Sequence, residues 1–465
     1  MTSPSIIYRT PEELAADPAF IRFIRCLPII LSFFAEPVYG QTASQATNIK
    51  SDQYGGSLTV VGKATGWFHL ETIGGRSWLV TPAGHGFVSL GVNHIGNMLP
   101  AGRPVTSDAV QTISANLQRG GYNTWGYESP VPTDPNAPFF GSLLLTHTGH
   151  YHQGKDFWFD DVFDPAYQQS IRAKIRNYCG RMAPLPNLIG YYWTDTPEWD
   201  LALARKSRGT DWVSSLRSRG SDAPGEMRYI DFLNQTYAGD IKALNQAYGM
   251  QAPSFDWLTT HDFNPLDQQR AEVQRDDELF LQLIARELYR VTAEAFREAD
   301  PNHLLFGERY KMNLHPDVVL KEAMRYIDVL SIQPGPENGT AHGPGKDETE
   351  FNEVLFDRLH QLTGKPIIVC DHSLSFYTPT YPRILWNQYP DPKAAALGYQ
   401  SFLTAAMAKP YMIGFQQCQF ISVFRTERNH LKQGLLDING TPYAEFIDRL
   451  GDTNRRSLDQ RYRNW

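Results

Sequence analysis

The chain has 465 residues, of which 42% are hydrophobic and 12% aromatic, so it can bury a core as large as that of a single α/β barrel with insertions. Its net charge of -7 and the lack of any Lys/Arg run exclude nucleic acid as an expected partner. Beyond the N-terminal region no apolar run approaches the length that spans a membrane.

The N-terminal region predicts a secretory signal peptide. Arg22 and Arg25 precede the apolar run 26–35, and small or tolerated residues follow at 38–40, at the spacing of a cleavage site. The leader before the run carries acidic residues, and the alternative is an amphipathic N-terminal helix. The signal peptide predicts a secreted or periplasmic protein.

Local composition and the positions of Gly and Pro residues indicate how the chain divides into regions. We predict a signal peptide with its leader at 1–40, a poorly ordered lead-in at 41–57, a barrel domain at 58–450 and a tail at 451–465. The barrel domain includes an N-terminal β-hairpin cap at 58–85 and a helical insertion at 200–275. The cysteines outside the leader show no metal-binding or C-x-x-C spacing, so we expect buried apolar roles for Cys179, Cys370 and Cys418.

A strand and helix rhythm begins after the cap. Eight short apolar runs are predicted as strands: Gly86–Asn93, Tyr122–Tyr127, Ser142–Thr146, Leu188–Thr194, Leu304–Tyr310, Ile327–Gln333, Pro366–Cys370 and Tyr411–Phe415. Helical patterns are predicted at Ser107–Arg119, Pro165–Arg181, Glu226–Tyr248, Asp276–Ala299, Val318–Tyr326, Glu348–Leu362 and Asp391–Ala408. Continuous apolar strands that alternate with helices indicate a parallel sheet covered on both faces. Eight such units predict an α/β fold, the (β/α)8 TIM barrel.

The ends of the predicted strands carry polar and aromatic residues. In a TIM barrel the loops after the strands converge on the active site, so these residues are the expected site. The stretch 188–200 is the most informative, because a buried apolar strand ends in Trp193, Asp195, Glu198 and Trp199. Carboxylates supply the acid, base or nucleophile of sugar cleavage, and aromatic faces stack on sugar rings.

Three carboxylates are the catalytic candidates, namely Asp371 after the seventh strand and Asp195 and Glu198 after the fourth. One carboxyl group would protonate the leaving oxygen, and the other would attack the anomeric carbon or activate water. A separation of about 5 to 5.5 Å predicts retention and about 6.5 to 9.5 Å predicts inversion. The substrate-binding candidates are Asn93, His94, Trp125, Trp193, Glu308, Gln333, His372 and Gln416.

Five stretches resemble the exo-acting β-agarase family and its β-galactosidase-like relatives, within the clan of retaining TIM-barrel glycoside hydrolases. They are GRSWLVTPAGHGFVSLGVNH at Gly75–His94, IGYYWTDTPEW at Ile189–Trp199, KPIIVCDHSLSF at Lys365–Phe376, YMIGFQQCQF at Tyr411–Phe420 and GLLDINGTPYAEF at Gly434–Phe446. The resemblance runs from about Gly66 to Phe446. It implies hydrolysis of a galactose-containing, agarose-like or related algal carbohydrate without a cofactor.

The resemblance also implies substituted catalytic positions. The family carries Asp-Asn-Glu after the fourth strand, where this chain has Asp195-Thr196-Pro197, so Glu198 serves as the acid only if the loop shifts by one residue. The family nucleophile is Glu, and Asp371 stands at the matching position. Gln416-Gln417 stands where the family tends to have His-Trp.

Two other functions stay open at this point. One is a barrel that binds carbohydrate without cleaving it. The other is a metal-dependent sugar-converting enzyme, in which His94, His147, Glu308, Asp371 and His372 would converge, because imidazole and carboxylate groups suit a divalent metal. None of these five residues belongs to an H-x-H or H-E-x-x-H motif, so no metal is predicted.

Overall fold

The structure is a computed structural model. It describes residues 49–98, 106–145, 159–194, 198–220, 222–261, 269–312, 315–334, 350–380, 387–425 and 430–464. The predicted signal peptide and most of the lead-in lie outside these residues. Within them, no helix combines the length and apolar character that crossing a membrane requires.

The central sheet is the predicted barrel. Its strands are β5 (Ser89–Val92), β6 (Thr124–Trp125), β7 (Phe139–Ser142), β8 (Leu188–Thr194), β9 (Leu304–Glu308), β10 (Tyr310–Lys311), β11 (Leu330–Gln333), β12 (Ile367–Phe376) and β14 (Met412–Cys418). All neighbours pair in parallel, in the order β10-β11-β12-β14-β5-β6-β7-β8-β9. Because β9 and β10 are separated by one residue, they form one interrupted strand, and the (β/α)8 fold is confirmed.

The interrupted strand closes the barrel. Tyr310 of β10 lies opposite Ile332 of β11. Below the interruption, the Asp328 N–H donates to the Leu305 carbonyl oxygen at 2.8 Å. Every strand therefore has a neighbour on both sides, as closure of a barrel requires.

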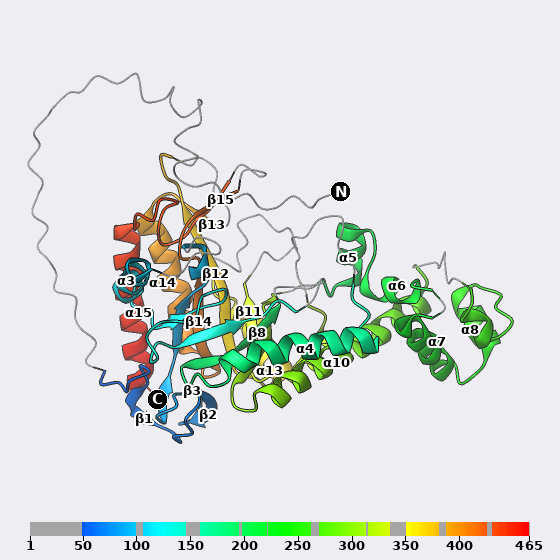
Figure 1. Ribbon diagram of the computed structural model, residues 1–465. Coiled ribbons are helices and arrows are strands. Elements are labelled where there is room, and N and C mark those ends of the chain that lie inside the picture. Colours follow the sequence, from blue (N-terminus) through cyan, green and yellow to red (C-terminus); the bar gives the residue numbers. More distant parts are fainter. Residues whose placement is uncertain are drawn as a thin grey trace, which may run out of the picture.

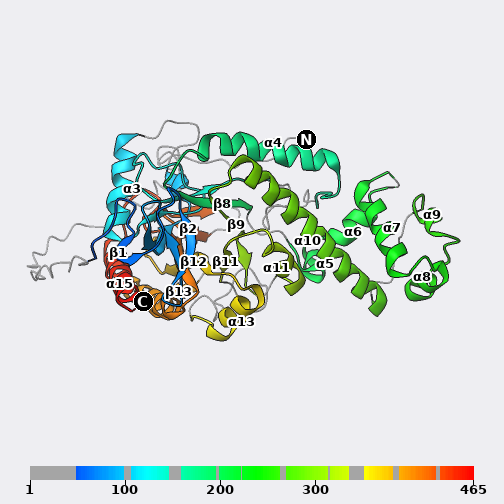
Figure 2. The same ribbon diagram turned by 90° about the horizontal axis from the view of Figure 1, so that it is seen from below.

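The predicted N-terminal cap forms a separate antiparallel sheet. Its strands are β1 (Ser57–Val61), β2 (His69–Ile73), β3 (Arg76–Val80) and β4 (His85–Phe87), in the order β1-β4-β3-β2. The Ser77 N–H donates to the Pro410 carbonyl oxygen just before β14, so the cap covers the N-terminal ends of the barrel strands. Figure 1 shows it at the lower end of the barrel, and Figure 2 shows it from below.

Helices surround the barrel and follow the predicted rhythm. They are α3 (Ser107–Arg119), α4 (Pro165–Met182), α10 (Ala271–Ala299), α11 (Asp317–Ala323), α13 (Glu353–Thr363), α14 (Pro392–Ala408) and α15 (Ala444–Arg463). Asp164 caps α4, with Pro165 at its first position, and Asp391 caps α14 in the same way. Side chains at 2% exposure or less, such as Phe140, Ile189 and Phe306, fill the barrel interior, and a larger cluster fills the space between strands and helices.

The helical insertion follows β8. It comprises α5 (Leu201–Arg208), α6 (Trp212–Arg217), α7 (Pro224–Thr236), α8 (Ile241–Tyr248) and α9 (Phe255–Leu258). The single helix expected at 226–248 is two helices, because Ala238 and Gly239 adopt positive φ and Asp240 caps a new helix. Figure 1 shows the insertion extending from the barrel beyond α4 and α10.

Several boundaries differ from the prediction, and two of the differences change what a segment was expected to be. The third strand was expected at 142–146 and lies at Phe139–Ser142, where Phe139 and Phe140 are buried; of the predicted run, Leu144 is 44% exposed while Leu145 is buried outside the strand. Residues 451–463 were expected to form a tail, and they are the second half of α15. The apolar residues of that half are spaced so widely among charged residues that the helical face escapes notice.

Candidate active site

The carboxyl ends of the barrel strands meet at the end of the barrel opposite the cap. Asp371 lies there on β12, with 6% of its surface exposed. The Arg309 guanidinium donates from Nη1 to Asp371 Oδ2 at 2.5 Å, and Arg309 also lies over the Tyr127 ring, 4.1 Å from its centroid. These contacts place Asp371 in a buried ion pair.

The charges around Asp371 keep it ionised. Burial by itself raises the pKa of Asp371, but the positive charges of Arg309 and Lys432 oppose this shift, and the pKa lies below its ordinary value. The other carboxylate oxygen, Oδ1, has no hydrogen-bond partner in the part of the chain that the structure describes. Asp371 therefore presents one free, negatively charged oxygen.

An irregularity in β12 turns Asp371 toward the mouth. The register between β12 and β14 shifts between Val369 and His372. His372 points the opposite way, with its ring 4.5 Å from that of Phe402 and 4.9 Å from that of Phe415. His372 was expected to contact substrate, and it lies instead in the core between the barrel and α14.

His94 comes from the end of β5 and faces the same space. His94 and Glu128 both adopt a left-handed backbone, with φ of 57° and 52°, which non-glycine residues seldom do. His94 Nδ1 lies 2.7 Å from Glu128 Oε2. Burial lowers the pKa of His94 and the charge of Lys432 lowers it further, while Glu128 opposes the shift, so the ring is neutral. With Nδ1 donating to Glu128, Nε2 is left as an acceptor.

Asn93 has a structural role at the barrel mouth. Its Nδ2 donates to the Cys370 carbonyl oxygen at 2.7 Å, and its Oδ1 accepts from the Tyr127 N–H at 2.9 Å. The side chain is fully buried. Asn93 therefore ties β5 to the ends of β6 and β12, and both of its polar atoms are engaged in the protein.

Cys418 is a residue of the mouth that the sequence analysis left in the core. One potential ligand atom from each of His94, Asp371 and Cys418 lies within 4.8 Å of the other two. Burial raises the pKa of the Cys418 thiol to about 12, with Asp371 adding to the shift. The alternation of side chains along β14 offered a signal, because Cys418 lies two residues after Gln416 and so faces the same way.

Gln416 lies deeper in the barrel. Its Nε2 donates to Ser89 Oγ at 2.8 Å, and Ser89 donates to Thr124 Oγ1 at 2.9 Å. Gln333 ends β11, half-buried and opposite Lys311 of β10. Gln416 therefore supports the floor of the mouth, and Gln333 lies on its rim.

Both tryptophan candidates are core residues in the structure. Trp193 is 2% exposed and stacks on Phe296 of α10, with ring centroids 5.6 Å apart. Trp125 is 6% exposed and belongs to the hydrophobic cluster outside the barrel. Their large apolar surfaces pack the barrel against its helices, which is the commoner use of tryptophan.

The two glutamate candidates come from neighbouring parts of the barrel, Glu308 from the end of β9 and Glu198 from the chain after β8, and His315 acts on both. Trp199 Nε1 donates to Glu308 Oε2 at 3.0 Å, and His315 Nε2 lies 3.8 Å from that oxygen. Glu198 is 3% exposed, and its pKa is raised by burial, with Lys311 and His315 opposing the shift. Glu198 Oε2 has no hydrogen-bond partner among the residues described. Burial thus favours a protonated Glu198.

The candidates that remain are Asp195 and the five residues considered together for a metal site. Asp195 and His147 lie outside the described residues. Of the five side chains considered for a metal, His94 and Asp371 meet, while Glu308 and His372 point into separate regions of the core. Arg309, the ion-pair partner of Asp371, was not among the candidates predicted from the sequence.

The chain is similar in sequence or in fold to several known proteins. No protein-family model matches the chain. A curated relative, beta-agarase B of Vibrio sp. (strain JT0107), is 20% identical over 318 residues, which cover 67% of this chain and 32% of that protein. The match thus spans about a third of the curated relative.

Two solved structures share the fold over most of the chain. An exo-beta-agarase superposes with a TM-score of 0.74 at 18% identity, covering 89% of this chain and 68% of the other. The agarase AgWH50C gives a TM-score of 0.73 with the same identity and coverage. Over 89% of its length the chain therefore has the fold of these agarases, and the fold expected from the resemblance is confirmed.

Proposed function

We propose that the chain is a glycoside hydrolase that cleaves O-glycosidic bonds of a galactose-containing, agarose-like or related algal polysaccharide or oligosaccharide. The observation that carries the proposal is a contrast between two buried carboxyl groups. The surroundings of Asp371 lower its pKa, whereas burial raises the pKa of Glu198. Two carboxyl groups whose pKa values are pushed apart have the properties of a base or nucleophile and a general acid.

Asp371 would act on the anomeric carbon. Its free Oδ1 either attacks that carbon or takes a proton from the water that does, while Arg309 holds Oδ2. Glu198 would give its proton to the glycosidic oxygen, so that the leaving sugar departs as an alcohol. Asp195 stays a candidate for either role or for orienting the acid.

The agarase names of the similar proteins support the class of substrate. Uncharged sugars suit the mouth, because its hydrogen-bonding groups include neutral His94 and the carboxylate of Asp371. The leader predicted at 1–40 fits an exported enzyme, since such polysaccharides lie outside the cell. Export is part of the proposal.

The test is hydrolysis of agarose-derived oligosaccharides by the purified protein, followed by chromatography of the products. Asp371→Asn should lower kcat/KM by at least about 100- to 10,000-fold, the range expected when one acid or base is removed. The matched control is Asp448→Asn, which changes a carboxylate that is 56% exposed and pairs with Arg119 on the outer surface. Its activity should equal that of the wild type.

The outcome that contradicts the proposal is equally specific. Retained turnover in Asp371→Asn would remove the two-carboxylate mechanism. A wild-type protein that binds the oligosaccharides with no product formed would be the carbohydrate-binding barrel instead.

A further inference from the structure

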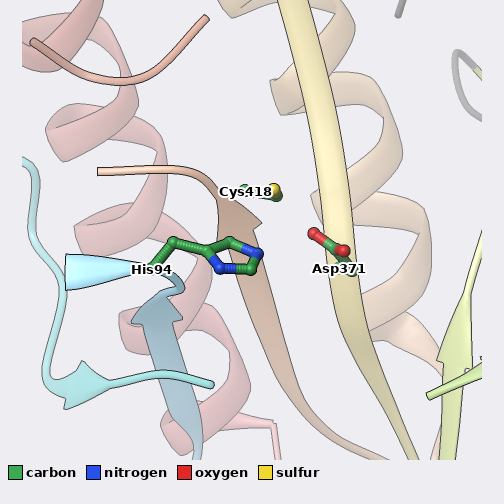
Figure 3. Close-up of side chains that lie close together, drawn as sticks. All are labelled: His94, Asp371 and Cys418. Carbon is green, nitrogen blue, oxygen red and sulfur yellow. The ribbon is translucent and has the colours of Figure 1, made fainter. Parts of the chain in front are cut away.

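Three side chains from three strand ends converge at the barrel mouth. His94 follows β5, Asp371 lies on β12 and Cys418 ends β14. Figure 3 shows the imidazole ring between β5 and β12, with the carboxylate of Asp371 turned toward it and Cys418 beside both. A nitrogen, an oxygen and a sulfur atom of these groups all lie within 4.8 Å of one another.

Two of the three groups present a buried atom with no partner. Among the described residues no nitrogen or oxygen donor reaches His94 Nε2 or Asp371 Oδ1, although the side chains are only 7% and 6% exposed, and the Asp371 carboxylate also interacts with the Cys418 thiol. Leaving a buried polar atom without a partner is unfavourable, so two such atoms side by side favour a bound ligand. A cation satisfies both acceptors at once.

Neighbouring residues hold the His94 imidazole and the Asp371 carboxylate in orientations that suit metal binding. Glu128 Oε2, 2.7 Å from His94 Nδ1, fixes the tautomer that leaves Nε2 unprotonated. A carboxylate on the outer nitrogen of a metal-binding histidine is the usual arrangement. Arg309 occupies only Oδ2 of Asp371, so a cation can bind Oδ1 while the ion pair stays intact.

We propose that His94 Nε2, Asp371 Oδ1 and Cys418 Sγ bind one Zn²⁺ ion. One nitrogen, one oxygen and one sulfur ligand suit this borderline-soft cation, and three protein ligands leave a fourth tetrahedral position for water or a sugar hydroxyl. On binding, the Cys418 thiol releases its proton to solvent, and the sulfur coordinates as thiolate. The two negative ligands offset the charge of the ion beside Arg309 and Lys432.

The site has a consequence for catalysis, which rests on the proposed function. Zinc on Asp371 Oδ1 occupies the oxygen that would attack the anomeric carbon or activate water. Zinc binding and sugar cleavage therefore exclude each other, and micromolar zinc should inhibit the hydrolase.

Binding is tested with Co²⁺ as a spectroscopic probe of the full chain. We expect one equivalent of Co²⁺ to give the near-ultraviolet absorption of a thiolate–cobalt bond, and Zn²⁺ to abolish it by displacement. Cys418→Ser should lose the absorption and bind metal about 10- to 100-fold more weakly. Cys179→Ser is the control, because it removes another buried thiol, on α4 away from the mouth, and should keep the spectrum.

Two results would overturn the inference: a wild-type protein without the thiolate band, or a Cys418→Ser variant that keeps it. The activity assay separates this failure from failure of the proposed function. Zinc should inhibit the wild type and should have at least tenfold less effect on Cys418→Ser. If no substrate is cleaved by any variant, the proposed function fails, while the cobalt spectrum still decides the metal site.

Discussion

Arg309 supplies the positive charge that keeps Asp371 ionised. The pair is buried, with 5% of the arginine side chain and 6% of the aspartate side chain exposed. The sequence shows Glu308 beside Arg309 and suggests that those two pair. The structure differs because successive side chains along an extended chain point in opposite directions, so Glu308 accepts from Trp199 while Arg309 donates to Asp371. A partner 62 residues away cannot be recognised from spacing alone.

Replacing Arg309 should therefore destabilise the fold. Arg309→Gln leaves Asp371 as a buried charge without its ion-pair partner, and we expect the free energy of unfolding to fall by about 3–5 kcal/mol at neutral pH. The folded-state pKa of Asp371 is lowered, so its stabilising contribution is complete above the ordinary value of 3.8 and is lost as the pH falls through the lowered pKa. The deficit of Arg309→Gln should accordingly shrink in strong acid.

Urea unfolding at several pH values measures this deficit. Arg119→Gln is the matched control, because Arg119 is 40% exposed in its pair with Asp448 and such pairs contribute about 0–1 kcal/mol. A loss in Arg309→Gln no larger than that of the control would show that the buried pair does not stabilise the mouth.

At the scale of elements, α15 shows how a helix escapes detection in a sequence. Its first half follows the recognisable stretch 434–446, whereas its second half reads as a charged tail. Arg461 lies in that half and is 3% exposed. Its guanidinium donates to the carbonyl oxygens of Met407, Lys409, Pro410, Met412 and Ser77. Those carbonyl groups come from two segments far apart in the sequence, residues 407–412 and Ser77 of β3, so tertiary contacts decide the end of this helix.

Arg461 should be essential for attaching the cap to the barrel. Arg461→Met keeps much of the apolar contact with the Trp78 ring, 5.0 Å away, but leaves several buried carbonyl groups without their donor. We expect the free energy of unfolding to fall by about 3 kcal/mol or more, since each unsatisfied buried group costs about 1–3 kcal/mol. Thermal unfolding measures the loss. Arg463→Met, on an exposed face of the same helix, is the control, and equal stability of the two variants would contradict this role.

At the scale of the whole molecule, the barrel could be predicted because each strand and helix carries its own periodicity. The site could be predicted only in outline. The predicted ends of the strands indicated where Asp371 and His94 would lie, since any barrel brings the strand ends together. They did not tell which side chains face inward, because the irregularity at Val369–His372 and the left-handed backbone of His94 decide that locally. For the same reason His372 and Trp193 were expected at the mouth and lie in the outer core.

The two proposed catalytic carboxyl groups also come from different parts of the barrel and have opposite electrostatic surroundings: Asp371 lies on β12, and Glu198 lies between β8 and α5. Asp371 must be ionised and Glu198 protonated for the proposed reaction. Activity should therefore fall in acid below the ordinary pKa of 3.8 for Asp371, and it should fall on the alkaline side above the ordinary 4.5 for Glu198. The bell shape is a property of the assembled molecule, because neither group alone produces both limbs.

The proposed role of Glu198 as proton donor is tested by the pH dependence of kcat/KM. We would measure it for the wild type and Glu198→Gln on an aryl galactoside with a good leaving group. Such a substrate needs little help from an acid, so the variant should retain measurable activity. We predict that the alkaline limb disappears in Glu198→Gln while the acidic limb of Asp371 stays in place. An alkaline limb that is unchanged in Glu198→Gln would show that Glu198 is not the proton donor.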